Sequence, residues 1–162
     1  MPSLGRPSEA AVPAKVLPVS ASATKDVPRA PVVRGAVLGR LEIARLGVSA
    51  IVVEGINART LRRAVGHIPG TALPGESGNV AISGHRDTFF RALKDIRQDD
   101  ELLLTTLEGS YRYRVESIKV VEPGDMAVLD DSGESVLTLV TCYPFYYVGP
   151  APKRFIVRAH RI

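Results

Sequence analysis

The runs TLVTCYPF at residues 138–145 and KRFIV at residues 153–157 decide how this chain is interpreted. The β-branched residues of the first run predict a strand that ends at Cys142, the only cysteine, and Pro144 stops the regular pattern there. Arg154 opens a second predicted strand, after a loop rich in Tyr, Gly and Pro. A thiol at the end of one strand and a guanidinium at the start of the next can meet at one edge of a sheet. Together with a histidine they would form a site for acyl transfer through a thioester.

Short strands separated by turn residues dominate the chain from about residue 38 onward. The expected strands cover residues 41–47, 49–55, 79–83, 101–106, 111–120, 136–141 and 154–160, with 126–129 as a further strand or turn. Residues 60–65 and 88–96 are expected to form short helices. Because no long helix separates the strands, the pattern predicts an all-β fold, either a sandwich or a closed barrel.

The first part of the chain has a different composition from the rest. Residues 1–36 contain six of the twelve prolines and no aromatic residue, so we expect residues 1–37 to form a Pro/Ala-rich disordered tail or stalk. The folded domain is expected to cover residues 38–162. Five basic and two acidic groups lie in residues 1–36, which accounts for most of the formal net charge of +4. The folded part therefore shows no basic stripe typical of a nucleic-acid-binding protein, and no nucleic-acid partner is expected.

Several kinds of site are not expected from this composition. One cysteine excludes an internal disulfide framework and a multi-cysteine metal cage, and no metal or cofactor is predicted. The carboxylates at 99–101 and 130–131 match no dedicated calcium loop, and solvated turns are the better interpretation. No run approaches the roughly 18–20 apolar residues that span a membrane. Prolines interrupt the N-terminal pattern of a signal peptide, so the chain as given is expected to be soluble.

Position distinguishes Cys142 and His85 from ordinary residues of their kinds. A lone cysteine is more often an inert small hydrophobe, but Cys142 is expected at a sheet edge, where substrate can reach it. His85 directly follows Gly84 and the strand at 79–83, and the glycine permits close backbone approach to a ligand. His67 follows a predicted helix and is expected at its C-terminus, where the helix dipole favours it. His160 is expected on the surface.

Arg154 is the third candidate for the site. Period-2 alternation places Arg154, Ile156 and Arg158 on one face of the last predicted strand. An arginine at the start of this strand can point over the edge of the sheet, where an oxyanion would form. An ordinary solvated arginine is the alternative, and Arg158 and Arg86 are weaker candidates for the same role.

These residues carry a resemblance to a known family. Thr138-Leu139-x-Thr141-Cys142, with Arg154 twelve residues later and Gly84-His85-Arg86 upstream, resembles the signature of the sortase transpeptidases. The flanking residues agree best with the class D type, and they are PGxxGN at 74–79, DTFF at 87–90 and YPF at 143–145. The resemblance extends over about residues 38–162.

The resemblance implies a fold and a reaction. Sortases are eight-stranded closed β-barrels, here with one or two short helices. They lie at the extracytoplasmic face of the bacterial membrane, usually held by an N-terminal membrane segment that this chain does not show. They cleave an LPxTG-like sorting signal after Thr through a cysteine thioester and pass the acyl group to an amine. The implied partners are proteins with a C-terminal sorting signal and an amine acceptor, either a cell-wall peptide or a pilin lysine.

The resemblance also assigns roles to individual residues. Cys142 is the implied nucleophile, His85 the acid/base and Arg154 the group that stabilises the oxyanion and positions substrate. Thr141 is expected to assist through its hydroxyl or its backbone amide. The Leu and Pro of the sorting signal are expected in an apolar groove lined near Val140 and Ile156. Tyr143 is expected in a wall of the same site.

Two other functions remain open at this point. The same cysteine and histidine could serve a cysteine hydrolase or endopeptidase that uses water as the acceptor. The chain could also be a non-catalytic β-barrel binding or pilus-assembly module in which the cysteine is structural.

Overall fold

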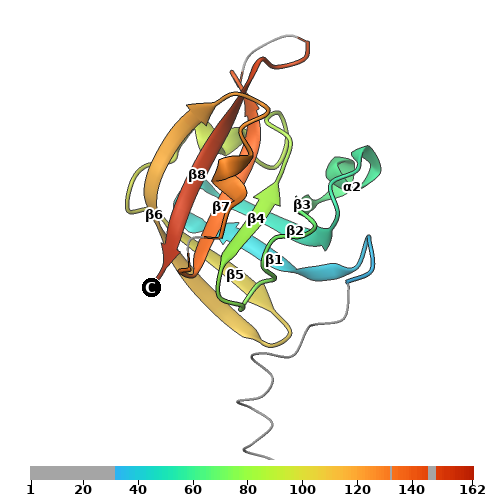
Figure 1. Ribbon diagram of the computed structural model, residues 1–162, viewed down its shortest axis with the longest axis vertical. Helices are drawn as coiled ribbons and strands as arrows, with labels where there is room; N and C mark the ends of the chain where they lie inside the picture. Colours follow the sequence, from blue (N-terminus) through green and yellow to red (C-terminus); the bar gives the residue numbers. More distant parts are fainter. Residues whose placement is uncertain (1–31, 132, 146–148) are drawn as a thin grey trace, which may run out of the picture. The chain divides into compact units, whose positions relative to one another are not determined.

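The computed structural model describes residues 32–131, 133–145 and 149–162, and the predicted tail lies mostly outside this part of the chain. The described residues form a closed β-barrel with the strand order β1-β2-β3-β4-β7-β8-β6-β5 (Figure 1). The expected all-β, eight-stranded barrel is thereby confirmed. The elements in chain order are β1 (Val37–Ile43), η2 (Ala44–Leu46), β2 (Val48–Glu54), α2 (Ala58–Arg63), β3 (Val65–His67), β4 (Asn79–Ser83), η3 (Arg91–Asp95), β5 (Glu101–Thr106), β6 (Gly109–Val121), η4 (Met126–Leu129), β7 (Val136–Tyr143) and β8 (Lys153–Arg161).

Three local expectations were wrong. The strand predicted at 41–47 ends at Ile43, because residues 44–46 form a single 3-10 turn that Gly47 terminates with a φ of 70°. The segment 126–129, expected as a strand or a turn, forms a 3-10 turn, in agreement with the second alternative. The short strand β3 was missed altogether, since its first residue was assigned to the preceding helix. That helix, α2, ends earlier than predicted, and Asn57 caps it by accepting a hydrogen bond from Thr60 N–H (2.9 Å).

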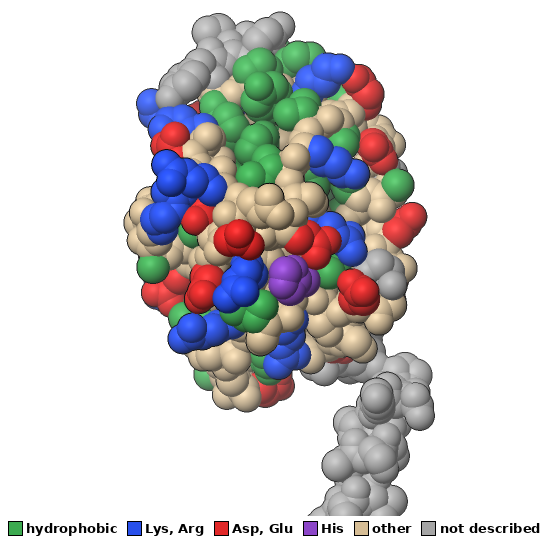
Figure 2. Space-filling view, turned by 90° about the vertical axis from the view of Figure 1, so that its left-hand side faces the viewer, with side chains coloured by type: hydrophobic (Ala, Val, Ile, Leu, Met, Phe, Trp, Pro, Cys, Tyr) green, Lys and Arg blue, Asp and Glu red, His purple; other side chains and the backbone are tan. Residues whose placement is uncertain are grey.

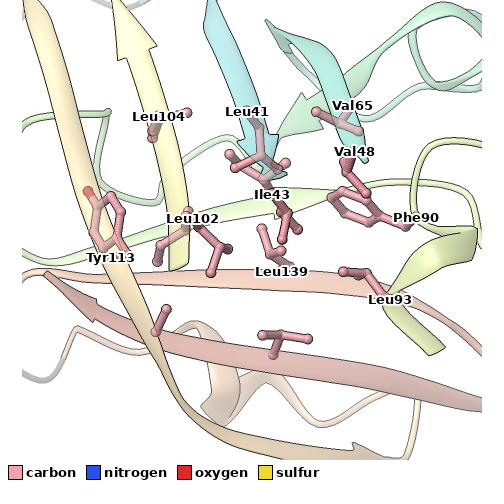
Figure 3. Packing of buried hydrophobic residues seen from close by; sticks show 14 of the residues in the cluster. Leu41, Ile43, Val48, Val65, Phe90, Leu93, Leu102, Leu104, Tyr113 and Leu139 are labelled. Atoms are coloured by element: carbon pink, nitrogen blue, oxygen red, sulfur yellow. The ribbon is translucent and has the colours of Figure 1, made fainter. Parts of the chain in front are cut away.

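The core fills the inside of the barrel, and strand alternation supplies it. On β6 Tyr113 and Val115 are buried, as the alternation of residues 111–116 predicted, while Arg112 is exposed. Leu139 and its neighbours from other strands pack against one another in Figure 3. Each fully buried Leu or Val contributes roughly 1.5–3 kcal/mol from the hydrophobic effect. Burial also raises the pKa of the Tyr113 phenol, so this hydroxyl stays protonated in the core.

Charged side chains of both signs are interspersed over one face of the barrel. Figure 2 shows Lys and Arg side chains lying among Asp and Glu side chains, with hydrophobic side chains gathered towards one end of this face. Opposite charges also pair on the barrel, as Arg158 does with Glu116 (2.7 Å). The charge on this face is therefore mixed in sign.

The direction of the strands determines where the functional side chains lie. β4 and β7 are parallel neighbours, whereas β7 and β8 are antiparallel. The carboxyl ends of parallel strands reach the same edge of a sheet. The end of β4, the end of β7 and the start of β8 consequently meet at one edge of the barrel (Figure 1).

Candidate functional site

Cys142 and Arg154 lie opposite each other in adjacent strands. The β7–β8 register pairs Cys142 with Arg154 and Val140 with Ile156. Directly opposed residues in an antiparallel pair have their side chains on the same face, with Cβ atoms about 4.5–5.5 Å apart. Thiol and guanidinium therefore leave one face of the sheet at the same level, as the sequence indicated. Both side chains are only partly buried.

The β4–β7 register brings His85 to the same level. Ser83 pairs with Val140, and Gly84 N–H continues the ladder by donating to the Val140 carbonyl (3.1 Å). His85 is two residues beyond Ser83, as Cys142 is two residues beyond Val140. β4 ends at Ser83, and His85 lies in the turn that follows it. This turn lies at the edge of the barrel near which β7 carries Cys142 and β8 carries Arg154.

A core contact shapes the turn that carries His85. A Cβ atom on Gly84 would lie 2.7 Å from the ring of Phe90, which is fully buried. Phe90 N–H in turn donates to the His85 carbonyl (3.1 Å). The sequence suggested that the glycine leaves room for a ligand, but the close approach is made by the Phe90 ring. Gly84 therefore allows the strand end to pack directly on the core.

Backbone carbonyls of the β7–β8 connection hold Arg154. Its Nη1 donates to the Lys153 carbonyl (2.9 Å) and the Ala151 carbonyl (3.2 Å). Arg86 Nη2 donates to the Gly149 carbonyl (2.8 Å) from the residue next to His85. The His85 turn and the described part of the β7–β8 connection are thus linked at the same edge as the thiol.

Thr141 and Tyr143 lie on the other face of β7. Thr141 is buried, and its Oγ1 is the one buried side-chain oxygen or nitrogen in the described residues without a hydrogen-bond partner. The Tyr143 ring stacks on Phe155 (5.9 Å between centroids), which belongs to the core cluster. Among the predicted substrate-binding residues, Val140 and Ile156 lie on the same face as Cys142. Thr141 and Tyr143 lie on the opposite face of the strand.

A small pocket of about 90 Å³ lies on the face that carries Cys142. This volume corresponds to roughly three water molecules. Val140, Arg154 and Ile156 contribute to its lining, together with Ile68 from the β3–β4 loop. The remaining lining residues come from the last residue of β6 and from the segment between β6 and β7, and they are Val121, Glu122, Pro123, Asp125, Val128 and Leu129.

Two buried polar residues hold the lining of this pocket in place by hydrogen bonds, and the sequence analysis did not identify them. Asn79 Nδ2 donates to the Val128 carbonyl (2.9 Å), and Thr138 Oγ1 donates to Asn79 Oδ1 (2.6 Å). These bonds tie β4 and β7 to the wall at Val128. The available signal was a polar residue at the start of a buried apolar strand, which requires a hydrogen-bond partner.

The other two histidines have different surroundings. His67 is not a helix C-terminal residue, because it lies in β3, is 1% exposed and contacts Glu54. It was misplaced because β3 was merged with the helix before it. His160 lies in β8, and its partly exposed ring pairs with Glu116 (3.3 Å).

The acidic segments contain no metal site in the part of the chain that the structure describes, since no three His, Cys, Asp or Glu side chains gather there. Asp100, expected in a solvated turn, instead accepts from Arg45 at both carboxylate oxygens (2.7 Å each). The hydrogen bond from Arg45 holds the pKa of Asp100 below its usual value. No helix among the described residues is both long enough and apolar enough to span a membrane.

Comparison with known proteins identifies the family. The sortase domain family model matches residues 41–162, a range that contains His85, Cys142 and Arg154. The chain belongs to the sortase family. It is 38% identical to sortase D of Bacillus subtilis (strain 168) over 129 residues, which are 79% of this chain and 65% of that protein. It is 27% identical to sortase A of Listeria monocytogenes over 113 residues, which are 67% of this chain and 50% of that protein. This sortase chain therefore spans between half and two thirds of the length of these relatives.

Solved sortase structures have the same barrel. A Clostridium perfringens sortase D5 transpeptidase superposes with a TM-score of 0.74 at 32% identity, covering 81% of this chain and 82% of that one. Sortase A from Corynebacterium diphtheriae superposes with a TM-score of 0.74 at 31% identity, covering 79% of this chain and 61% of that one. The sortase resemblance inferred from the sequence is thereby confirmed.

Proposed function

We propose that this sortase is a cysteine transpeptidase that cleaves an LPxTG-like sorting signal after Thr and transfers the acyl group to an amine. One observation carries the proposal, namely the register that aligns Cys142 with Arg154 on β8 and with the end of β4, just before His85. A nucleophile, a proton carrier and a charged donor on one accessible face are the parts that acyl transfer requires.

The first half-reaction forms the acyl-enzyme. The Cys142 thiolate attacks the Thr carbonyl carbon, and the resulting oxyanion is stabilised by the Arg154 guanidinium, which the carbonyls at Ala151 and Lys153 orient. The peptide bond after Thr breaks as His85 gives its proton to the departing amine. The products are a thioester on Cys142 and the released C-terminal part of the signal.

The second half-reaction transfers the acyl group. Neutral His85 takes a proton from the incoming amine as its nitrogen attacks the thioester carbonyl. Collapse of this second tetrahedral intermediate forms the new amide and returns the thiolate. Because the two half-reactions share one covalent intermediate, ping-pong kinetics are expected.

The pocket beside Arg154 is our candidate for the apolar part of the signal. Val140 and Ile156 line it from strands β7 and β8, and Ile68 and Val128 line it from the segments outside these strands. Thr141 and Tyr143 would then act on substrate only through the backbone, since their side chains face the core side of β7. The natural partners on this hypothesis are proteins with a C-terminal sorting signal and a cell-wall or pilin amine, at the extracytoplasmic face of the membrane.

Intact-protein mass spectrometry tests this function. The protein is mixed with an LPxTG-type peptide, with and without a small amine, and Cys142→Ala serves as the control. An acyl adduct that depends on Cys142 and is discharged by the amine to a ligated peptide is the expected result. Discharge to the free acid that ignores the amine would instead indicate a hydrolase. No adduct, together with a Cys142 thiol that fails to react with a small thiol reagent, would favour a non-catalytic binding module.

A further inference from the structure

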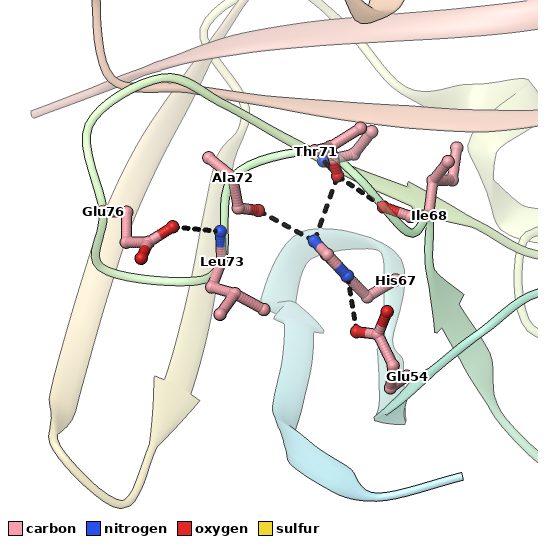
Figure 4. Close-up of polar contacts among 8 residues, drawn as sticks. Glu54, His67, Ile68, Thr71, Ala72, Leu73 and Glu76 are labelled. Carbon is pink, nitrogen blue, oxygen red and sulfur yellow. Dashed lines mark hydrogen bonds and ion pairs between the residues drawn. The ribbon is translucent and has the colours of Figure 1, made fainter. Parts of the chain in front are cut away.

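His67 is a buried histidine that the proposed reaction does not use. It lies in β3 with 1% of its surface exposed, and both ring nitrogens have partners (Figure 4). Nδ1 lies 2.7 Å from Glu54 Oε1 on β2. Nε2 lies 2.8 Å from the Ala72 carbonyl oxygen and 3.0 Å from Thr71 Oγ1, both in the loop between β3 and β4.

Counting donors and acceptors shows where the protons must be. The Ala72 carbonyl can only accept, so Nε2 must carry a hydrogen at this distance. The Thr71 hydroxyl already donates to the Ile68 carbonyl (2.7 Å), so it also accepts from Nε2. A further proton must lie between Nδ1 and the Glu54 carboxyl. The pair therefore holds one proton more than a neutral imidazole beside an ionised carboxylate.

The bonds around His67 shape one turn of the β3–β4 loop. Ile68 N–H donates to the Ala81 carbonyl (2.9 Å), and Ala72 N–H donates to the Asn79 carbonyl (3.0 Å). The His67 ring lies between these two anchors and joins the turn to β2 through Glu54 (Figure 4). Ile68, the first residue of the turn, is also a wall residue of the pocket beside Arg154.

We propose that His67 is a positioning residue, which keeps residues 68–72 in place with the proton that it shares with Glu54, and so keeps Ile68 against the sorting signal. The assignment of the pocket to the signal rests on the proposed function. The contribution of His67 and Glu54 to the position of the turn can be measured without substrate.

Loss of the shared proton would rearrange the turn. A neutral His67 that donates from Nδ1 to Glu54 presents the Nε2 lone pair to the Ala72 carbonyl, which repels it. The Thr71 hydroxyl can satisfy Nε2 only by leaving the Ile68 carbonyl. The other charged groups nearby are Arg34, which packs on Gly55 beside Glu54, and Glu76, which accepts from Leu73 N–H (2.8 Å).

The substitution Glu54→Gln removes the proton shared with His67 but keeps a hydrogen bond to the His67 ring. The side-chain amide that this substitution introduces can donate to Nδ1 while Nε2–H still donates to Ala72, so the turn is held by a pair that has no extra proton to lose. His67→Gln removes the ring and is the stronger perturbation, and circular dichroism checks that it folds. His160→Gln is the matched control, because His160 also pairs with a glutamate but lies on β8 and is partly exposed.

The first experiment observes the proton and the turn without substrate. Long-range ¹H–¹⁵N spectra distinguish the ring nitrogens of the three histidines, and His67→Gln assigns one set. We expect Nε2 of His67 to be protonated at pH 7, and an unprotonated Nε2 would overturn the proposal. Amide hydrogen exchange of residues 68–72 should be faster in His67→Gln than in wild type or His160→Gln. Exchange in Glu54→Gln should stay close to the wild-type rate, and equal rates in His67→Gln and wild type would also overturn the proposal.

The second experiment asks whether the turn serves substrate binding. With an LPxTG-type peptide, His67→Gln should raise KM about tenfold with little change in kcat, as expected for losing one charge-assisted hydrogen bond. An unchanged KM with a loosened turn would overturn the role of Ile68 and leave the proposed function intact. If wild type itself forms no acyl adduct, the proposed function fails and the substrate role of Ile68 falls with it. The spectra and exchange rates then still decide whether His67 holds the turn.

Discussion

The two faces of the β7–β8 pair carry side chains of different kinds on the same backbone. One face, the core face, packs Leu139, Phe155 and Val157 into the barrel interior. The other, the site face, carries Cys142 and Arg154. Side chains on a strand alternate, so neighbouring residues in the chain serve packing and chemistry separately. Substitutions on the two faces should therefore separate activity from stability.

The largest expected effect is on the site face. Cys142→Ala should abolish peptide cleavage and amine ligation, because no acyl-enzyme can form without the thiol. The free energy of unfolding should change by less than about 1 kcal/mol, since the thiol is only partly buried and small. Product analysis by mass spectrometry and urea denaturation measure the two quantities. Residual cleavage by the purified variant would show that Cys142 is not the nucleophile.

Leu139→Ala makes the reciprocal change on the core face. Leu139 is fully buried, so we expect a loss of about 2–5 kcal/mol in the free energy of unfolding from lost transfer energy and the remaining cavity. Below its melting temperature the variant should keep most of its kcat/KM. Urea denaturation and peptide kinetics on the same sample provide the test. If activity fell in step with Cys142→Ala while the protein stayed folded, the separation of the two faces would be wrong.

Arg154→Ala should lower kcat/KM by about a hundredfold, as does loss of an oxyanion donor elsewhere. Arg154→Lys should recover little, because an ammonium lacks the planar fork that donates to Lys153 and Ala151 carbonyls. Arg158→Ala is the matched control, since Arg158 shares the strand but pairs with Glu116. Steady-state kinetics of the three variants measure the effect. Wild-type activity from Arg154→Ala would remove Arg154 from the oxyanion site.

Gly84→Ala tests the one place where the two faces depend on each other. The new Cβ would lie 2.7 Å from Phe90, so the His85 turn or the Phe90 ring must move. We expect a loss of about 1–3 kcal/mol in stability from overpacking, together with lower activity. Thermal unfolding and kinetics measure both, and Gly124→Ala, at an exposed position where an added Cβ meets nothing within 4 Å, controls for the change of residue type. Full activity in Gly84→Ala would mean that the His85 turn tolerates displacement.

The smallest effect concerns acid stability, away from both faces. Arg45 lowers the pKa of Asp100, so the ionised carboxylate stabilises the fold, fully above its unfolded pKa of about 3.9. This contribution is lost as the pH falls through the lower folded pKa. Asp100→Asn should therefore be less stable than wild type at pH 7 and lose less stability on acidification. Melting temperatures at pH 7 and pH 3 provide the comparison, and equal losses in the two proteins would contradict it.

The strands could be predicted where alternation was long enough to be recognised. Residues 111–116 alternate between core and solvent, and the run at 136–141 consists only of Val, Leu and Thr, so both strands were predicted correctly. β3 was not, because a strand of three residues has no measurable period. It is a strand only because β2 and β4 pair with it on either side. The 3-10 turn at 44–46 was missed for the same reason.

The site was predicted in part. Cys142, His85 and Arg154 are each marked by a strand end in the sequence. The structure adds the β7–β8 register, which pairs Cys142 with Arg154, and the β4–β7 register, which ends two residues before His85. The hydrogen bonds of His67 and Asn79 could not be predicted from the sequence. Their partners lie 13 residues away at Glu54 and 49 residues away at Val128.

By itself, the sequence determined the fold class, the family and the candidate residues for the proposed chemistry, because alternation, turn residues and a short motif are local features of the chain. Only the tertiary structure decided which face of β7 each residue occupies, what approaches Gly84 and what holds the pocket walls. The physical reason is that strand register and the burial of a polar group depend on pairings between distant segments. Those pairings form only when the barrel closes.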